Sequence, residues 1–394
     1  MAWTVRSLTV GAGRHYEIIG TINDDHLAVA DTIGARIGDS IQDPITQPVG
    51  GMRDENGDLW IACDNSPMRR MTDGLEIEFT PAITVENAQN GDGIDDLIDM
   101  SMATDGSGWL LPCSWTDDVC RVYDRDTGQL ISTIGVPGAA GNIEDGRLTN
   151  PHSALRLSNG NILVSSFNGE GNPAASANGS ITEWDVSTET ATLVAVRLLA
   201  SGNQISAVGL NVIQSPAKMI FDNDDPNSIW VSEYDRGRVT KIDTTNWLVS
   251  DIIEAPSGVP EMRRSYGLCQ MQDGTIVVSP SLGRRVYGIN PITKALVFEI
   301  TPELYGSQSN NFRGLFEIEP GVIAWTDWSS QHIYSAPISD IQVEYEEPPV
   351  PTAWEIIEER LPQGFDLTTR TLTIPPYDVG RIPDEIVVLL RRLT

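Results

Sequence analysis

The feature that most constrains this chain is a recurring pair of short apolar segments joined by a glycine-containing turn. In the stretch 150–171 (NPHSALRLSNGNILVSSFNGEG), apolar runs centred on Leu155 and Leu163 flank the turn Ser158-Asn159-Gly160-Asn161. Asn-Gly tolerates the positive φ that a tight hairpin needs, so this stretch predicts two antiparallel strands.

The second strand of this hairpin recurs along the chain at intervals of roughly 50 residues, each time after a Gly- or Pro-containing turn. The six copies are Leu59–Cys63, Trp109–Cys113, Ile162–Ser166, Ile229–Glu233, Ile276–Pro280 and Ile323–Asp327. A third strand often follows, as in Ile181–Asp185 and Val239–Asp243, and a Thr-containing turn then leads into a fourth. A four-stranded antiparallel unit with this period is typical of a β-propeller blade.

We therefore predict an all-β fold, a six-bladed β-propeller over residues 49–345, with seven blades as the alternative count. Residues 1–48 alternate weakly between apolar and polar and predict strands that close the ring by completing the last blade. A large β-sandwich is the competing fold, but a sandwich has no reason to repeat these strands and turns in one order.

The repeated pattern resembles NHL-type propellers and their gluconolactonase-like relatives over roughly Val49–Ile338. The resemblance implies the propeller fold and does not fix the function. The gluconolactonase-like relatives hold a divalent metal with Glu, Asn and Asp ligands at the strand starts, and the resemblance implies a similar site here. This sequence departs from that pattern, because Asp99 is the carboxylate that we find at such a position.

The formal net charge is −29, which argues against nucleic acid and anionic membranes as partners. The acidic surface either meets a basic partner or serves as a solubility shell, and we favour the shell. The basic residues are Arg except for Lys218, Lys241 and Lys294, a bias that suits interfaces. The cysteines show no CxxC pair, so we expect reduced, mostly buried thiols; Cys113 and Cys120 flank a hairpin loop and could face each other.

The N-terminal residues contain no apolar signal segment, and no run is long enough to span a membrane. We therefore expect a protein made in the cytoplasm without Sec export, and no membrane insertion.

The C-terminal part differs in composition from the repeats. Residues 346–352 are a Pro-rich linker, and residues 353–394 are predicted to be a docking extension with a helix at Ala353–Leu361 and strands at Leu372–Ile374 and Ile386–Leu390. This extension is too small for a core of its own. Its apolar residues are expected either to contact a partner or neighbouring subunit or to fold back on the propeller: Trp354, Ile357, Leu361, Ile386, Val388 and Leu390.

Candidate binding residues follow from the repeat, because propeller ligands commonly bind where the innermost strands begin. Counting ten residues back from the second strands gives Val49 and the polar residues Asp99, His152, Tyr266 and Arg313, and the fourth blade has its equivalent near Pro216. These side chains could line a polar binding site at the channel mouth. The alternative is a hydrogen-bonded ring lining a water channel.

A calcium loop is the metal site that the sequence suggests. Asn90, Asp92, Asp96 and Asp99 occupy positions three, five, nine and twelve of an EF-hand-like loop, with Gly93 at position six. Ala88 at the first position cannot bind a metal, and an acidic turn is the alternative. No other cofactor is expected.

The sequence contains no GxSxG, HExxH or Walker motif. We therefore expect a non-catalytic propeller that acts as a structural or interaction module in an oligomeric assembly, for example a phage virion component such as a tail, fibre or decoration protein. The alternative is a metal-dependent lactonase or hydrolase of the gluconolactonase-like kind. Whether the chain is an enzyme stays open, with the balance towards no.

Overall fold

The structure is a computed structural model of the whole chain. It describes residues 7–10, 14–21, 48–54, 59–63, 69–71, 77–79, 97–103, 107–139, 143–167, 179–199, 207–256, 262, 264–280, 285–300, 312–328, 332–338, 365–366 and 371–372. The chain divides into two compact units, Met1–Val343 and Glu344–Thr394.

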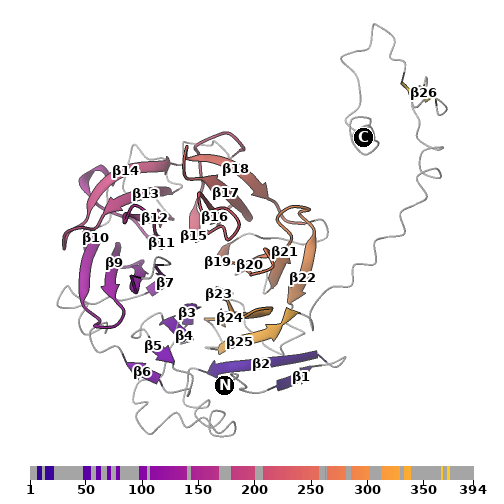
Figure 1. Cartoon of the computed structure of the whole chain (residues 1–394), viewed down its shortest axis with the longest axis horizontal. Coiled ribbons are helices and arrows are strands. Elements are labelled where there is room, and N and C mark those ends of the chain that lie inside the picture. The colour runs from indigo at the N-terminus through magenta and orange to yellow at the C-terminus, as the bar shows by residue number, and fades with distance from the viewer. Residues whose placement is uncertain are drawn as a thin grey trace. The chain divides into compact units, whose positions relative to one another are not determined.

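The first unit confirms the predicted all-β propeller. Its sheets surround a common centre, and each is an antiparallel ladder whose strands follow one another from the inside outwards (Figure 1). The first sheet contains β3 (Pro48–Arg53), β4 (Leu59–Cys63), β5 (Arg69–Met71) and β6 (Ile77–Phe79). The second contains β7 (Leu97–Met102), β8 (Trp109–Ser114), β9 (Val119–Asp124) and β10 (Leu130–Gly135), and a 3-10 turn, η1 (Ile143–Asp145), follows it.

The next three sheets repeat this order. The third contains β11 (Pro151–Arg156), β12 (Ile162–Ser166), β13 (Ser180–Asp185) and β14 (Thr192–Leu199). The fourth contains β15 (Pro216–Phe221), β16 (Ser228–Glu233), β17 (Arg238–Asp243) and β18 (Leu248–Ile253). The fifth contains β19 (Ser265–Gln270), β20 (Ile276–Pro280), β21 (Val286–Ile289) and β22 (Leu296–Ile300).

The last sheet joins the two ends of this unit. Its strands are β23 (Phe312–Glu319), β24 (Val322–Asp327), β25 (His332–Pro337), β2 (Arg14–Thr21) and β1 (Ser7–Val10), in that order. β2 pairs antiparallel with β25, so strands from the N-terminal segment complete a sheet that β23–β25 begin. This arrangement gives β25 a hydrogen-bonded neighbour on its outer edge.

The core lies between neighbouring sheets. One apolar cluster joins the third and fourth sheets through residues such as Leu163, Ile181 and Ile229, all fully buried. A second joins the fifth and last sheets through Phe298, Phe312 and Trp325. In the third, fourth and fifth sheets the second strands β12, β16 and β20 are buried along their whole length, which accounts for the continuous apolar run that each contains.

The six expected second strands correspond to β4, β8, β12, β16, β20 and β24. The bounds of β4, β12 and β20 agree with those predicted. All four cysteines are buried and none forms a disulfide; Cys113 and Cys120 lie opposite each other on β8 and β9. In the part of the chain that the structure describes, no helix is long and apolar enough to cross a membrane.

In the second unit, the described residues form one short ladder, β26 (Phe365–Asp366) with β27 (Thr371–Leu372). β27 falls at the start of one of the expected strands. The expected helix Ala353–Leu361, the strand Ile386–Leu390 and all six expected docking residues lie outside the described residues.

Candidate binding site at the start of the innermost strands

A β-bulge lies at the start of each innermost strand. In β11, the ladder partners of Pro151 and Ser153 are the adjacent residues Ser166 and Ser165, so His152 has no ladder partner. A bulge inserts an additional residue and re-aims its side chain. The corresponding residues are Val49 in β3, Ile98 in β7, Ala217 and Lys218 in β15, Tyr266 in β19, and Arg313 and Gly314 in β23.

A buried hydroxyl on the second strand holds the bulge in four of the sheets. In the third sheet, the Ser153 N–H donates to Ser165 Oγ over 3.0 Å. The same hydrogen bond joins Lys218 to Ser232, Gly267 to Ser279 and Gly314 to Thr326, at 3.0, 3.0 and 2.7 Å. The repeated Ser or Thr therefore satisfies a backbone donor that the irregular ladder leaves unpaired.

Aromatic residues stand directly after the second strands in four sheets: Trp115, Phe167, Tyr234 and Trp328. Two of them are anchored by their backbone. The Phe167 N–H donates to Asn150 O at 3.0 Å, and the Tyr234 N–H donates to Ser215 O at 2.9 Å. Asn150 and Ser215 directly precede innermost strands and have φ of 47° and 44°. This left-handed backbone is strained for residues other than Gly, and such strain is concentrated at functional sites.

These elements bring together a set of side chains that we term the axial cluster: Trp115, His152, Phe167, Lys218, Tyr234, Tyr266, Arg313 and Trp328. Its rings form a continuous chain of contacts. The imidazole of His152 stacks on Tyr266, with centroids 5.3 Å apart and planes 15° apart. Tyr266 contacts Tyr234 at 4.9 Å, and Tyr234 meets Phe167 edge-on at 4.5 Å. Phe167 in turn lies 5.8 Å from Trp115.

Two cations border this aromatic chain. The guanidinium of Arg313 lies between two rings, 5.0 Å from the centroid of Tyr266 and 4.9 Å from that of Trp328. No carboxylate among the described residues pairs with Arg313. Lys218, His152, Tyr266 and Arg313 line a cavity of about 10 Å³, which is room for one water-sized group.

His152 is the most informative member of the cluster. Its side chain is buried, and neither ring nitrogen has a hydrogen-bond partner among the described residues. Burial, together with the charges of Lys218 and Arg313, lowers the pKa of His152 to about 3. The imidazole is therefore neutral near pH 7 and offers one N–H donor and one acceptor that the described residues leave unused.

The two tyrosines share a hydrogen bond, in which the Tyr266 hydroxyl donates to the Tyr234 hydroxyl at 3.3 Å. Burial and then this hydrogen bond raise the pKa of Tyr234 well above its usual value. The Tyr234 hydroxyl is therefore neutral near pH 7, and Arg313 and Lys218 contribute positive charge to the cluster.

Three of the four residues expected at the channel mouth, His152, Tyr266 and Arg313, are brought together here. Asp99 does not occupy the corresponding ladder position. Leu97 pairs with Ser114, whereas Pro151 pairs with Ser166 over a shorter connection, so the equivalent of His152 in β7 is Ile98. The β7–β8 hairpin is two residues longer than the β11–β12 hairpin, so counting ten residues back from the second strand gave Asp99 instead of Ile98.

The sequence prediction also missed Lys218 and the four aromatic residues. The equivalent of His152 in β15 is Ala217, one residue beyond the expected Pro216, and Lys218 shares the same bulge. The aromatic residues could have been found from the pattern, because each one directly follows a second strand once β8 is aligned on Ser114 rather than Cys113.

The expected calcium ligands Asn90, Asp92 and Asp96 lie outside the described residues, and Asp99 lies within β7. Among the residues that the structure describes, no group of three or more His, Cys, Asp or Glu side chains is placed to hold a metal ion. The calcium site stays a prediction.

Comparisons with known proteins give similar solved structures but no family. No protein-family model matches the chain, and no curated protein matches its sequence. Among solved structures, the chain is similar to the WD40 β-propeller domain of Doa1, with a TM-score of 0.49, 13% identity, and coverage of 76% of this chain and 79% of that one. It is also similar to a streptogramin B lyase, with a TM-score of 0.48, 13% identity, and coverage of 75% and 94%.

Proposed function

We propose that this protein is a non-catalytic, six-bladed propeller that acts as an interaction module and receives a carboxylate of its partner at the axial cluster. The count of six is supported by the contacts of the innermost strands. β3, β7, β11, β15, β19 and β23 contact one another in that order, and β23 contacts β3 again. Each of these strands belongs to a different sheet, so one sheet corresponds to one blade.

The observation that carries the binding proposal is the unsatisfied imidazole of His152. A buried donor and acceptor without partners cost free energy, of the order of 1–3 kcal/mol each, so such a group is favoured where a ligand completes it. Arg313 and Lys218 lie on the same small cavity and add positive charge. An incoming carboxylate oxygen fits a water-sized space and can accept hydrogen bonds from His152 and Arg313.

The protonation states favour binding over proton transfer. General acid–base catalysis works best when the pKa of the catalytic group is near the operating pH. The pKa of His152 is about 3, and the pKa of Tyr234 is raised above its usual value. Both groups therefore suit the recognition of a ligand better than the transfer of a proton at neutral pH.

The larger assembly is the second part of the proposal. The chain carries a formal charge of −29, whereas Lys218 and Arg313 line the small cavity of the axial cluster, so an anionic group is favoured at this cavity over an average place on the surface. The apolar residues of the C-terminal extension support docking on a partner or a neighbouring subunit. A phage virion component is the kind of assembly protein that we propose.

The test is a titration with capped tripeptides. Acetyl-Ala-Glu-Ala-amide should shift the ring resonances of His152 in a saturable way, and the isosteric Gln peptide should not. Arg313→Gln should weaken binding at least tenfold, because it removes one charge-assisted hydrogen bond. Equal binding of both peptides would refute the carboxylate site. Lactone hydrolysis that a chelator abolishes would instead establish the hydrolase.

A further inference from the structure

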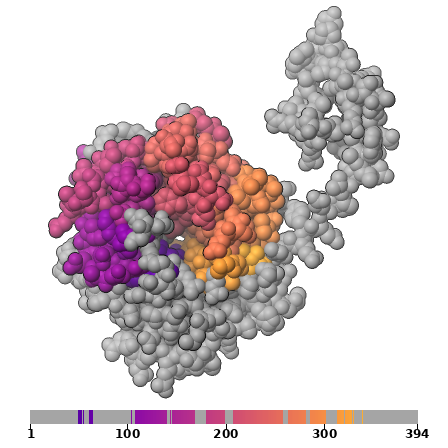
Figure 2. Space-filling view, viewed as in Figure 1, coloured from indigo at the N-terminus to yellow at the C-terminus, as the bar shows by residue number. Residues whose placement is uncertain are grey.

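The opposite end of the axis contains a larger cavity, of about 370 Å³. Its walls come from the later residues of β3, β11, β15, β19 and β23, so it lies where the innermost strands end. The space-filling view shows the blades around a central depression (Figure 2). A volume of this size is within the range of small-molecule sites, 300–1,000 Å³.

The walls of this strand-end cavity are mainly apolar. Met52, Leu155, Met219, Phe221 and Phe316, from four innermost strands, are among the residues that line it. Leu155 and Phe316 are each 5% exposed, so they form part of a packed wall rather than a free surface. Cys269 also lines the cavity, and burial raises the pKa of its thiol, which keeps it neutral and unreactive.

A cationic residue, Lys218, lies at the inner end of this apolar cavity. Lys218 lines both the strand-end cavity and the small cavity of the axial cluster, together with Gly51, Leu268 and Leu315. Lys218 is therefore common to the lining of both cavities, and it contributes a positive charge to each. Glu317 of β23 also lines the strand-end cavity, and its carboxylate accepts backbone hydrogen bonds from Gln272 and Gly321 at 2.9 and 2.8 Å.

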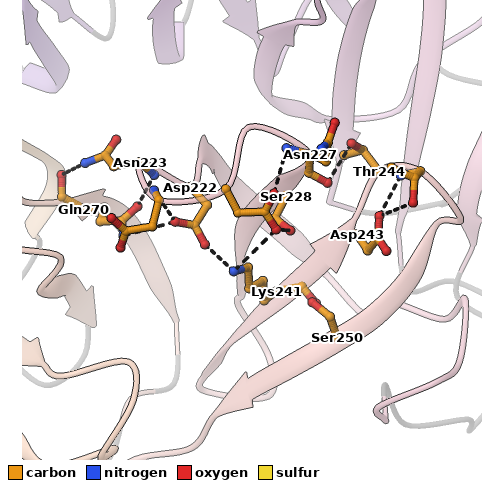
Figure 3. Close-up of polar contacts among 12 residues, drawn as sticks. Asp222, Asn223, Asn227, Ser228, Lys241, Asp243, Thr244, Ser250 and Gln270 are labelled. Carbon is orange, nitrogen blue, oxygen red and sulfur yellow. Dashed lines mark hydrogen bonds and ion pairs between the residues drawn. The ribbon is translucent and has the colours of Figure 1, made fainter.

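Hydrogen bonds between the fourth and fifth sheets hold one part of the rim (Figure 3). The Asn223 N–H donates to Gln270 Oε1 at 2.8 Å, and both residues line the cavity. The preceding Asp222 is paired with Lys241 at 2.5 Å. A rim fixed in this way is formed before a ligand arrives, so binding requires little ordering of the protein.

We propose that the strand-end cavity binds a small monocarboxylate with an apolar, ring-sized body. The body contacts Met52, Leu155 and Phe316, and the carboxylate points along the axis towards Lys218. The apolar wall and the charge of Lys218 are complementary, because the wall excludes water from the ion pair between Lys218 and the carboxylate and so strengthens this pair. This site shares Lys218 with the axial cluster but occupies a different cavity, and it does not depend on the function proposed for that cluster.

The probe is 2-naphthoate, and the neutral 2-naphthamide serves as its matched control. Isothermal titration should show one molecule of naphthoate per chain, and naphthamide should bind at least tenfold more weakly because it lacks the charge. Equal affinity of the two compounds, or no saturable binding of naphthoate at millimolar concentration, would overturn the proposal.

Three variants locate the site. Met52→Trp places a larger side chain, an indole ring, in the cavity and should weaken naphthoate binding at least tenfold. Lys218→Met should have a similar effect on naphthoate and little effect on naphthamide, and Lys218→Arg should restore most of the naphthoate affinity. Arg313→Gln, which alters the axial cluster alone, should leave the affinity for naphthoate within about twofold.

The variants also separate this proposal from the previous one. Loss of naphthoate binding in Arg313→Gln but not in Met52→Trp would show that the probe occupies the axial cluster, and the strand-end site would be wrong. Thermal unfolding of each variant identifies a substitution that merely destabilises the fold. If Lys218→Met is destabilised in this way, the naphthoate affinity of Lys218→Arg decides whether the charge at this position is needed.

Discussion

The two ends of the propeller axis are built from the same innermost strands and yet offer opposite chemistry. At the strand starts, the space is about 10 Å³ and is lined by His152, Tyr266, Arg313 and Lys218. At the strand ends, the space is about 370 Å³ and its walls are mostly apolar. The bulges account for part of this contrast, because those at the strand starts turn polar side chains towards the axis.

Between the two ends, the strands approach one another too closely for most side chains. A Cβ on Gly267 would lie 2.4 Å from both Arg313 O and Ser279 Oγ. A Cβ on Gly314 would lie 2.6 Å from the Cα of Gly50. These glycines let the first, fifth and last sheets pack backbone against backbone beside the small cavity, which Gly50, Gly267 and Gly314 help to line.

The largest expected effect comes from disrupting this close contact. Gly267→Val adds a branched side chain against backbone that has no room to move, and overpacking of this kind costs about 3 kcal/mol. We expect a corresponding fall in the free energy of unfolding, measured by urea denaturation, together with weaker binding at both ends of the axis.

Gly321→Ala is the matched control. Gly321 has a φ of 78° with no atom within 4 Å of the added Cβ, so the cost is that of the backbone alone, about 1 kcal/mol. If Gly267→Val is no more destabilising than this control, the fifth and last sheets do not pack as closely at Gly267 as described.

A smaller effect, at the strand starts only, is expected from Ser165→Ala. Ser165 Oγ accepts from the Ser153 N–H at 3.0 Å and donates to Ala217 O, in the next sheet, at 2.7 Å. Removing it leaves two buried backbone groups without these partners and should cost about 2 kcal/mol in urea denaturation. Peptide binding at the axial cluster should weaken, and naphthoate binding should persist.

Ser132→Ala controls for the loss of a buried hydroxyl as such. Ser132 is fully buried, and its Oγ has no hydrogen-bond partner among the described residues. Its removal should be close to neutral. Equal destabilisation by the two substitutions would show that the Ser165 hydrogen bonds do not hold the bulge.

The same contrast explains what could be predicted from the sequence. The middle of each sheet repeats, because every second strand packs between two sheets, and β4, β12 and β20 therefore match their predicted bounds. The position of each strand start, counted back from the second strand, depends on the length of the hairpin between the two strands, which periodicity does not report. The longer β7–β8 connection is the reason why Asp99 was expected in the place of Ile98.

The repeated sequence pattern could not predict contacts between different sheets. His152, Tyr266 and Arg313 were found because each lies at the same offset from its own second strand. The unsatisfied state of His152 depends on what Tyr266 and the two cations contribute from other sheets, and no single repeat contains this information. The strand-end cavity likewise draws its walls from five strands that are distant in sequence.

The smallest effect that we predict is a pH dependence confined to the strand starts. Burial lowers the pKa of His152 to about 3, while an exposed histidine in the unfolded chain titrates near 6.5. Between these values the unfolded state binds the additional proton, so this group makes stability fall as the pH falls. The limiting slope for one proton is about 1.4 kcal/mol per pH unit.

We expect about 1 kcal/mol of this loss between pH 6.5 and pH 5.5, where few carboxylates of ordinary pKa titrate. His152→Phe keeps the stacking on Tyr266 and removes the titrating group, so the free energy of unfolding of this variant should change less over the same range. Urea denaturation of both proteins at several pH values gives the difference directly. If the two slopes coincide, His152 is not held neutral by burial, and the two ends of the axis do not differ in their sensitivity to acid.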